Sequence, residues 1–405
     1  MRQILYISAL ASEKYINLEY KHTGKNPGFA VQKFSRLLVK GLMANGIDVE
    51  VLSNSPNTWN RAIIFKPTRE NENGVSYRYI PYVNLPFLKH LCLFFYSFFY
   101  VLTWGIYDRK NKSIVCDVLS ISICLGALLA TKINRIQAVG VVTDIYEMMI
   151  GNGRISFVSK LAAKLNSKYV SCFNKYLLLT EQMNDIVNLH NRPYIVMEAL
   201  CDSSLMTVSK NLVSKKYPKE VIYAGGIYEK YGLKMLAEGF LRANVQGAKL
   251  VYYGEGSFVD EYKALCARHP NLEYRGVASN DEILEAEQKA TLLVNPRFST
   301  EEFTKYSFPS KNMEYMASGT PLLTTKLPGM PKEYDNYIFL IEKETIEGFA
   351  DAIKHVLKCS MEELKEFGNK SRNFVLLNKN NIIQGKRVAD FIFESNKEKQ
   401  RQHIN

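Results

Sequence analysis

The sequence predicts an α/β protein of two domains, each built on a parallel β-sheet with helices on both faces. Its 405 residues exceed the roughly 100 to 200 that one domain usually takes. Strand-like apolar runs alternate with helical runs through nearly the whole chain, which is typical of βα units. The polar stretch 203–219 contains Pro218 and is the expected linker. We therefore expect Rossmann-like domains at 1–202 and 220–380, a cleft between them, and a last segment, 381–405, whose helix packs back.

The first domain is expected to begin with a short apolar strand, Gln3–Ser8. The loop Gly24–Gly28 follows and opens a helix in which Val31, Phe34 and Leu38 recur on one face. The remaining elements are a strand at 48–53, a strand at 113–116, a helix at 120–132 and strands at 137–142 and 176–179.

The second domain repeats this alternation. Its strands are expected at 221–224, 249–253, 272–275, 291–294, 321–325 and 338–341, and its helices at 233–240, 258–267, 283–286, 309–318 and 346–357. A last helix, about 382–397, lies beyond the second domain's pattern.

Positive charge is concentrated in the first half of the chain. The formal net charge is +12, and residues 1–200 carry 23 Lys and Arg against 13 Asp and Glu, while the remainder carries 29 against 27. A basic half indicates an anionic partner, which is a membrane surface, a phosphorylated acceptor or nucleic acid. Nucleic acid is the weakest of these, because the cations are dispersed through an α/β pattern without a recognisable nucleic-acid-binding module.

The cysteines and the start of the chain predict a cytoplasmic protein. Seven cysteines are scattered without a Cys-x-x-Cys pair, so we expect neither a disulfide framework nor a metal ribbon. The first residues, MRQILYIS, are followed too soon by polar residues to form a signal peptide. The sequence also has no Asp-x-Asp pair, no His-Glu-x-x-His and no Walker loop, and we expect no metal and no cofactor.

One segment is unusually apolar. Residues 86–112 are PFLKHLCLFFYSFFYVLTWGIYDRKNK, with no charge at 91–107. A spanning helix needs about 20 such residues, and Ser97, Thr103 and Gly105 interrupt the run. Three interpretations remain open: a spanning helix, a buried or partner-facing helix, and a helix in the membrane interface with basic residues at anionic headgroups. The last would make the protein peripheral on the inner face of the plasma membrane.

Two glycine loops are suited to binding phosphate. Gly24–Gly28 precedes a helix in the first domain, and Gly225-Gly226 follows the first strand of the second. Glycine lets backbone N–H groups and the positive end of a helix approach an anion closely. Simple strand-to-helix turns have the same composition, so both interpretations, a phosphate-binding loop and a simple turn, remain open.

The stretch 294–321 contains the densest set of candidate residues. Pro309 fits the first position of a helix that Gly319 ends. Ser310 and Lys311 at the helix start are suited to a phosphate, while Glu314 one turn later is placed to accept hydrogen bonds from a ribose diol. A solvated Lys-Glu pair on a surface helix has the same spacing.

Four segments of the chain are distinctive: SFPSKNMEYMASGTPLLTTKLPGMPKEY (307–334), VIYAGGIYEKYG (221–232), VVTDIYE (141–147) and LLLTEQMND (177–185). Through these segments the chain resembles the retaining glycosyltransferases of family four, which have the GT-B fold. The resemblance covers nearly the whole chain and is greatest to bacterial enzymes of capsular, exopolysaccharide or lipopolysaccharide biosynthesis. It implies a nucleotide-sugar donor held by the C-terminal domain, a lipid-linked or oligosaccharide acceptor held by the N-terminal domain, and metal-independent hexosyl transfer with retention.

The resemblance also assigns roles to single residues. Glu314 takes the place of the second glutamate of the family's Glu-seven-residues-Glu motif and would bind the donor ribose. The first glutamate, which usually touches the donor sugar, falls on Tyr306. The Arg and Lys of the family's diphosphate clamp fall on the uncharged Gly226 and Tyr231.

Substitutes for the clamp must therefore come from elsewhere, and Lys311, Arg297 and Lys230 are the candidates. Gly28 matches the glycine of the N-terminal loop near the donor phosphates. Asp144 lies near where relatives place a His or Asp beside the reacting sugar.

Retention without a well-placed nucleophile implies front-face attack, in which the leaving phosphate takes the acceptor proton. Positive charge at the diphosphate then matters more than a side-chain base. We accordingly assign Lys311 to stabilising the leaving group and Asp144 to orienting the reactants. The alternative, which the missing clamp residues and Tyr306 suggest, is a nucleotide-sugar epimerase or a non-catalytic sugar-nucleotide-binding protein of the same fold.

Overall fold

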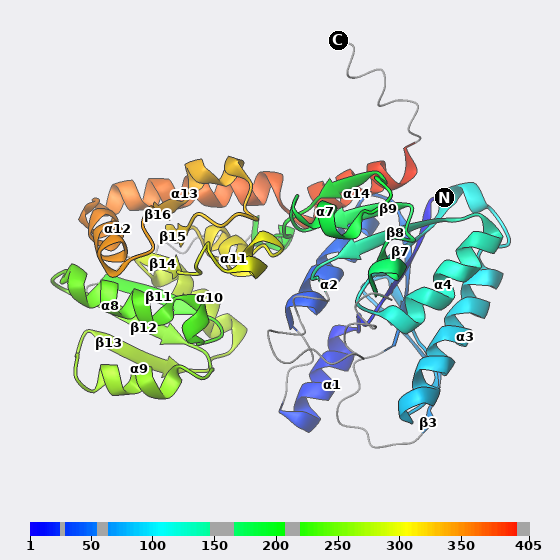
Figure 1. Cartoon of the computed structure of the whole chain (residues 1–405), viewed down its shortest axis with the longest axis horizontal. Coiled ribbons are helices and arrows are strands. Elements are labelled where there is room, and N and C mark those ends of the chain that lie inside the picture. Colours follow the sequence, from blue (N-terminus) through cyan, green and yellow to red (C-terminus); the bar gives the residue numbers. More distant parts are fainter. Residues whose placement is uncertain (25–28, 55–63, 146–165, 207–218, 395–405) are drawn as a thin grey trace, which may run out of the picture. The chain divides into compact units, whose positions relative to one another are not determined.

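The structure is a computed structural model that describes residues 1–24, 29–54, 64–145, 166–206 and 219–394 (Figure 1). The chain divides into two units: unit 1 contains Met1–Leu200 and Asn381–Asn405, and unit 2 contains Cys201–Asn380. Each unit has a mainly parallel sheet covered by helices, so the predicted α/β class is confirmed.

Unit 1 is built on an eight-stranded sheet with the order β10-β9-β8-β7-β1-β2-β5-β4. Neighbouring strands are parallel except for the edge pair of β4 and β5, which is antiparallel. The chain crosses over on either side of β1, so the carboxyl ends of β1 and β7 flank a switch point, where open α/β sheets bind ligands. The strands are β1 (Gln3–Ser8), β2 (Asp48–Ser53), β4 (Thr68–Glu72), β5 (Val75–Tyr79), β7 (Lys112–Asp117), β8 (Gln137–Val142), β9 (Lys175–Leu178) and β10 (Tyr194–Val196), and a separate pair joins β3 (Ile64–Phe65) to β6 (Tyr82–Val83).

Two pairs of helices cover the two faces of this sheet (Figure 1). The helices α2 (Phe29–Ala44) and α14 (Asn381–Phe393) share one apolar core with the strands, and α3 (Pro86–Trp104) and α4 (Ile121–Asn134) lie on the other face. The shorter helices are α1 (Glu13–Thr23), α7 (Met183–Val187) and the 3-10 turn η1 (Arg109–Asn111).

The last helix, α14, belongs to unit 1 although the chain reaches it through unit 2. Its Val388 and Ile392 are buried in the unit 1 core. The buried Lys175 at the start of β9 donates hydrogen bonds from Nζ to the carbonyl oxygens of Phe391, at 2.5 Å, and Ile392, at 3.2 Å. A lysine there satisfies carbonyl groups that have no partner within the helix and complements the negative end of the helix dipole. The predicted C-terminal helix thus packs back onto unit 1.

Unit 2 is built on a six-stranded parallel sheet with the order β13-β12-β11-β14-β15-β16. Its switch point lies between β11 and β14, which are neighbours in the sheet although two strands separate them in the chain. The strands are β11 (Lys219–Ala224), β12 (Ala248–Tyr253), β13 (Leu272–Gly276), β14 (Leu292–Asn295), β15 (Leu322–Thr325) and β16 (Phe339–Ile341).

The helices of unit 2 alternate with these strands along the chain. Phe240 of the first helix and Phe349 of the fifth are fully buried in a core shared with β11, β12 and β14. The helices are α8 (Leu233–Ala243), α9 (Val259–Cys266), α10 (Asn280–Lys289), α11 (Ser310–Ser318), α12 (Ile346–Lys358) and α13 (Met361–Asn378), and the 3-10 turns are η2 (Ser203–Met206), η3 (Glu229–Tyr231), η4 (Glu302–Lys305) and η5 (Lys332–Tyr337).

The structure corrects the sequence-based prediction in the region after β1. The glycine loop was expected to follow β1 directly, but α1 lies between them. Ser12 begins this helix by accepting a hydrogen bond at its side chain from the Tyr15 N–H, at 3.0 Å. A serine cap followed by an acidic residue is a helix-start signal that does not depend on an apolar repeat, which is why the periodicity missed it.

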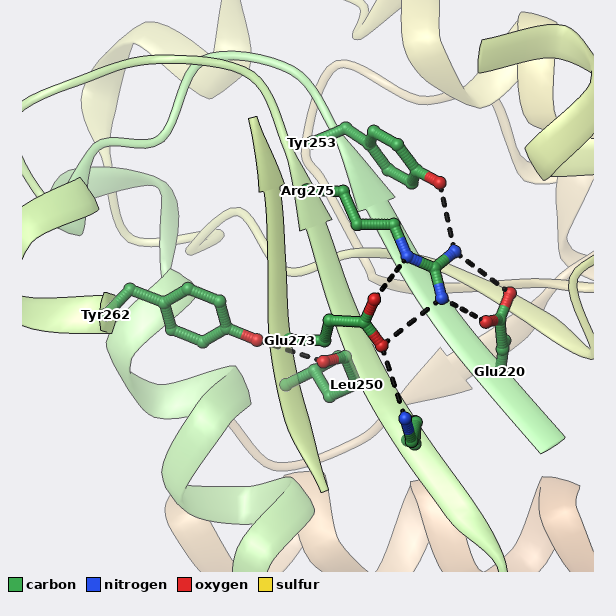
Figure 2. A network of polar contacts seen from close by, with 7 residues as sticks. Glu220, Leu250, Tyr253, Tyr262, Glu273 and Arg275 are labelled. Carbon is green, nitrogen blue, oxygen red and sulfur yellow. Dashed lines mark hydrogen bonds and ion pairs between the residues drawn. The ribbon is translucent and has the colours of Figure 1, made fainter. Parts of the chain in front are cut away.

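A network of polar side chains crosses the edge of the unit 2 sheet (Figure 2). Arg275 on β13 donates to Glu273 from Nε at 2.7 Å and to the Tyr253 hydroxyl from Nη1 at 3.0 Å. It also forms an ion pair with Glu220 on β11. The Arg275 side chain is only 29% exposed, so one half-buried cation serves two carboxylates on different strands.

We expect Arg275→Met to lower the free energy of unfolding by about 1–2 kcal/mol, because it leaves the carboxylates of Glu220 and Glu273 without this partner. Urea unfolding of the full chain measures this change. The matched control is Arg268→Met, which removes an exposed arginine of the same unit and should leave the midpoint unchanged. Equal midpoints for the two variants would contradict a stabilising role for the network.

Candidate functional site

The loop after β11 forms one side of the unit 2 switch point. The Gly225 N–H donates to the Tyr253 carbonyl at 3.0 Å, and the Tyr223 hydroxyl donates to the Gly226 carbonyl at 2.9 Å. Gly254 has a φ of +126°, and a Cβ there would lie 1.9 Å from the Gly225 carbonyl oxygen. The loops after β11 and β12 therefore pack backbone against backbone. The predicted glycine pair lies at the carboxyl end of the sheet, where backbone N–H groups can meet an anion without an intervening Cβ.

Arg297 follows β14 on the other side of the switch point. Its guanidinium carbon lies 4.9 Å from the ring centroid of Tyr231 and 6.0 Å from that of Phe303. The Nζ of Lys230 lies 5.5 Å from the same Tyr231 ring. Aromatic faces attract cations and hold them in place without neutralising their charge. The structure therefore gathers two of the three predicted substitute cations around Tyr231.

The charge of Arg297 also acts on the β11 loop. Burial raises the pKa of Tyr223, and the nearby Arg297 charge opposes that rise. Among the residues that the structure describes, neither Arg297 nor Lys230 forms an ion pair with a carboxylate. Both positive charges are accordingly available to an anionic ligand.

The helix α11 begins at the same edge of the sheet. The hydroxyl of Tyr315 accepts a hydrogen bond from the Ala224 N–H at 2.8 Å and donates to the Ala224 carbonyl at 3.1 Å. Asn295, the last residue of β14, donates from Nδ2 to Oδ1 of Asn312 at 2.6 Å. These buried contacts tie α11 to the ends of both switch-point strands. Ser310 is its first residue, so the unpaired N–H groups of the helix start lie at this edge.

Lys311 is engaged with carboxylates. Its Nζ lies 2.8 Å from Oε2 of Glu314 and 4.0 Å from Oε1 of Glu287 on α10. Burial lowers the pKa of the Lys311 ammonium, but the charges of Glu314 and Glu287 outweigh burial and raise it. The predicted Lys-Glu pair is therefore formed, with a third member from another helix that sequence spacing could not reveal. Lys311 differs in this respect from Arg297 and Lys230.

Of the two remaining predicted donor-site residues, Tyr306 and Gly28, the structure describes only Tyr306. Tyr306 closes η4, where its N–H donates to the Phe303 carbonyl at 3.1 Å, and its side chain is half-buried. Gly28 lies outside the described residues.

Unit 1 carries two carboxylates at the carboxyl edge of its own sheet. The predicted Asp144 follows β8 and lines a small cavity with Val118, Leu119 and Val170. Asp117 ends the adjacent strand β7, is 4% exposed and accepts a hydrogen bond from the Leu119 N–H at 3.1 Å.

Burial perturbs both of these carboxyl groups. It raises the pKa of Asp144 and raises that of Asp117 to about 6, where the Leu119 N–H acts in the opposite direction and the Asp144 charge adds to the increase. Perturbed carboxyl groups are typical of functional sites. Asp117 was missed by the sequence reasoning, although it directly follows a predicted strand, which is the signal that identified Asp144.

Unit 2 is similar in sequence to a known family. Residues 218–359 match the family model of glycosyl transferases group 1. This match includes the glycine loop, Arg297 and all of α11. No curated protein has a significant sequence match to the chain.

Solved structures resemble the whole chain, including unit 1. HepE of Anabaena, in complex with UDP, has 14% sequence identity and a TM-score of 0.64 over 96% of this chain and 98% of HepE. The lipopolysaccharide outer core galactosyltransferase WaaB has 15% identity and a TM-score of 0.62 over 96% and 99%. A trehalose-6-phosphate structure from E. coli, bound with UDP-2-fluoro glucose, has 9% identity and a TM-score of 0.65 over 97% and 99%. The whole chain thus shares its fold with these proteins, and the predicted GT-B fold is confirmed.

Proposed function

We propose that the protein transfers a hexosyl group from a nucleotide-sugar donor to a lipid-linked glycan acceptor, with retention of anomeric configuration, in the cytoplasmic steps of bacterial surface polysaccharide synthesis. One observation carries the donor part of this proposal. The β11 loop, the start of α11 and the cations Arg297 and Lys230 converge at the switch point of unit 2. Such a site fits a compact ligand with two or more negative charges.

We assign the donor diphosphate to this group of residues. Backbone N–H groups of Gly226 and Ser310 would approach its oxygens, and Arg297 with Lys230 would balance its charge in place of the family's usual Arg and Lys. Glu314 would accept hydrogen bonds from the ribose, with Lys311 holding its carboxylate in position. Support comes from HepE and the E. coli trehalose-6-phosphate structure, which contain UDP and UDP-2-fluoro glucose.

The proposed chemistry needs no side-chain base. The acceptor hydroxyl oxygen attacks the anomeric carbon from the face that the diphosphate leaves, and the bond between that carbon and the phosphate oxygen breaks. The departing phosphate oxygen takes the hydroxyl proton, so the nucleoside diphosphate leaves with that proton. Positive charge beside the diphosphate lowers the barrier because negative charge develops there. Asp144 of unit 1 would orient the reactants.

Separate observations support the class of acceptor and the independence from metal. WaaB is described as a lipopolysaccharide outer core galactosyltransferase, and the family resemblance of 307–334 is to surface-glycan enzymes. Metal independence rests on the absence of an Asp-x-Asp pair from the sequence. It predicts that turnover is unchanged by EDTA, and loss of turnover in EDTA would remove this part of the proposal.

A thermal-shift screen tests donor binding. Nucleoside diphosphates and their sugars are added to the full chain, and one base is expected to raise the unfolding midpoint. A ligand at 100 times its Kd adds about 2.7 kcal/mol to the stability of the folded state, which raises the midpoint of a domain of this size by about 5–10 °C. No shift with any nucleoside diphosphate would refute the donor site.

The stabilising sugar nucleotide then enters a product assay with and without a lipid-linked oligosaccharide. Transfer requires the acceptor, and the anomeric configuration of the product, read by NMR, decides retention. A new nucleotide sugar formed without acceptor would instead identify an epimerase.

A further inference from the structure

The helices α3 and α4 of unit 1 each expose a row of large apolar side chains. Members of each row recur every four residues, and this spacing keeps them on one side of a helix. Exposure reaches 88% at Phe87 on α3 and 60% at Ile133 on α4. The rows, which together we call the α3–α4 face, are Phe87, Leu91, Phe95 and Phe99 on α3, and Leu125, Leu129 and Ile133 on α4.

Close contacts hold the two helices side by side. A Cβ on Gly126 would lie 2.1 Å from the Phe94 carbonyl oxygen, so α4 approaches the backbone of α3 directly at its middle. His90 Nδ1 lies 2.7 Å from the Ser122 hydroxyl near the start of both helices. Asn134 Nδ2 donates to the Leu102 carbonyl at 2.9 Å near the end of both. The helices therefore run parallel, and the two rows keep a fixed spacing.

Exposed cations gather at and just beyond the carboxyl-terminal ends of these parallel helices. Neither α3 nor α4 contains an Asp or a Glu. In the described parts of the chain, none of the four exposed cations at this end forms an ion pair with a carboxylate. Two of them, Lys132 and Arg135, also line an open groove with Gln137 and Asn174. The four are Arg109, Lys110, Lys132 and Arg135.

The packing of α3 argues against a spanning helix. By length and composition, α3 is the one helix of the described residues that could cross a membrane, through Phe87–Trp104. Its opposite side is part of the fold, however, since Leu93, Ser97 and Val101 are at most 2% exposed. Crossing a bilayer would break these contacts and those with α4. A partly buried helix with one apolar side matches an interfacial position instead.

We propose that the α3–α4 face is seated on an anionic lipid bilayer, with the apolar rows in the interface and the four cations against lipid phosphates. Charge decides between a bilayer and a second copy of this chain. Whichever way two copies were joined through this face, α3 and α4 of one copy would offer no acidic residue to the four cations of the other. Anionic headgroups supply the missing charge. This inference does not depend on the proposed sugar transfer, because vesicle binding needs no nucleotide sugar.

Cosedimentation of the full chain with vesicles tests the proposal. We expect binding at low salt to vesicles of phosphatidylglycerol and phosphatidylcholine at about 3:7, weaker binding at high salt, and none to phosphatidylcholine alone. Each cation near the surface contributes about fivefold to the partition coefficient. The variant Arg109→Gln/Lys110→Gln/Lys132→Gln/Arg135→Asn should therefore bind several hundred-fold more weakly, where Asn suits the positive φ of position 135.

A second variant tests the apolar rows. Phe95→Ser/Phe99→Ser changes two exposed side chains and should weaken binding at least tenfold. The matched controls lie in unit 2: Val277→Ser/Leu377→Ser for the apolar change, and Arg268→Gln/Lys354→Gln/Lys358→Gln/Lys365→Gln for the charge change. Both controls should bind like the unaltered protein, and circular dichroism confirms that each variant is folded.

Three results would overturn the proposal. The first is no binding of the full chain to anionic vesicles, and the second is equal binding by each variant and its control. The third is a dimer of the unaltered protein, seen by light scattering, that does not bind vesicles and that the variant Phe95→Ser/Phe99→Ser does not form. That result would identify a second copy as the occupant.

Discussion

Arg297→Ala is expected to lower kcat by about 100-fold, the loss that follows removal of one strong electrostatic donor to a developing negative charge. The reason lies in the contrast between two cations of the proposed donor site. Arg297 is held by the Tyr231 and Phe303 rings and keeps its charge available, whereas the Lys311 charge is shared with Glu314 and Glu287. Steady-state kinetics with the donor found in the thermal-shift screen measures the effect.

Lys311→Ala should behave differently. If Lys311 positions Glu314 for the ribose, its loss raises the donor KM by about 10- to 100-fold and changes kcat little, since a charged hydrogen bond is worth about 1.5–3 kcal/mol in binding. Lys311→Arg should restore most of the affinity. The sequence-based assignment of Lys311 to the leaving group predicts the reverse: a large fall in kcat for Lys311→Ala and a small one for Arg297→Ala.

The control for both variants is Arg242→Ala, which removes an exposed arginine that pairs with Glu347. It should leave kcat and KM unchanged. Unfolding midpoints are compared for all variants, because loss of Lys311 also removes a cation beside the buried Glu287.

Asp117→Asn is expected to make the protein more stable at pH 7 by about 3 kcal/mol, but not at pH 3. Burial raises the pKa of Asp117 to about 6, whereas an unfolded chain has a value near about 3.9. Between about pH 4 and 6, the folded state therefore holds a proton on Asp117 that the unfolded state releases. Stability from this group is complete below about pH 4 and is lost as the pH rises through about 6. Asparagine cannot ionise and still accepts the Leu119 N–H.

Urea unfolding between pH 3 and pH 8 measures this difference. The gap between Asp117→Asn and the unaltered protein should open between about pH 4 and 6 and then stay constant. Asp108→Asn is the control, because Asp108 is exposed and its positive φ suits asparagine. A gap that does not vary with pH would mean that burial of Asp117 does not disfavour its charged form.

Most of the fold could be predicted because its signals are local. Strands β1, β2 and β8 have the predicted bounds, since buried parallel strands form short continuous apolar runs. Elements without such runs were missed. The hairpin of β4 and β5 turns through Asn73 and Gly74, both with positive φ, and its outer strand is polar because it lies at the sheet edge.

The candidate site was predicted in its residues but not in its arrangement. Arg297 and Lys230 were named as separate candidates, and 66 residues lie between them in the sequence. Their meeting depends on β14 pairing with β11, which is a property of strand order. The Glu287 contact of Lys311 depends likewise on how α10 packs against α11. The spacing of residues along the chain predicts neither of these contacts.

The return of α14 to unit 1 sets the order in which the two units can be completed during synthesis. Unit 2 is one continuous stretch, Cys201–Asn380, and can finish folding once that stretch has left the ribosome. Unit 1 still lacks Val388 and Ile392 at that time, and the Phe391 and Ile392 carbonyl groups that accept hydrogen bonds from Lys175 are not yet in place. The usual N-terminal-first order is thereby reversed. A chain that stops before residue 381 would leave the first unit, rather than the second, with an uncovered core.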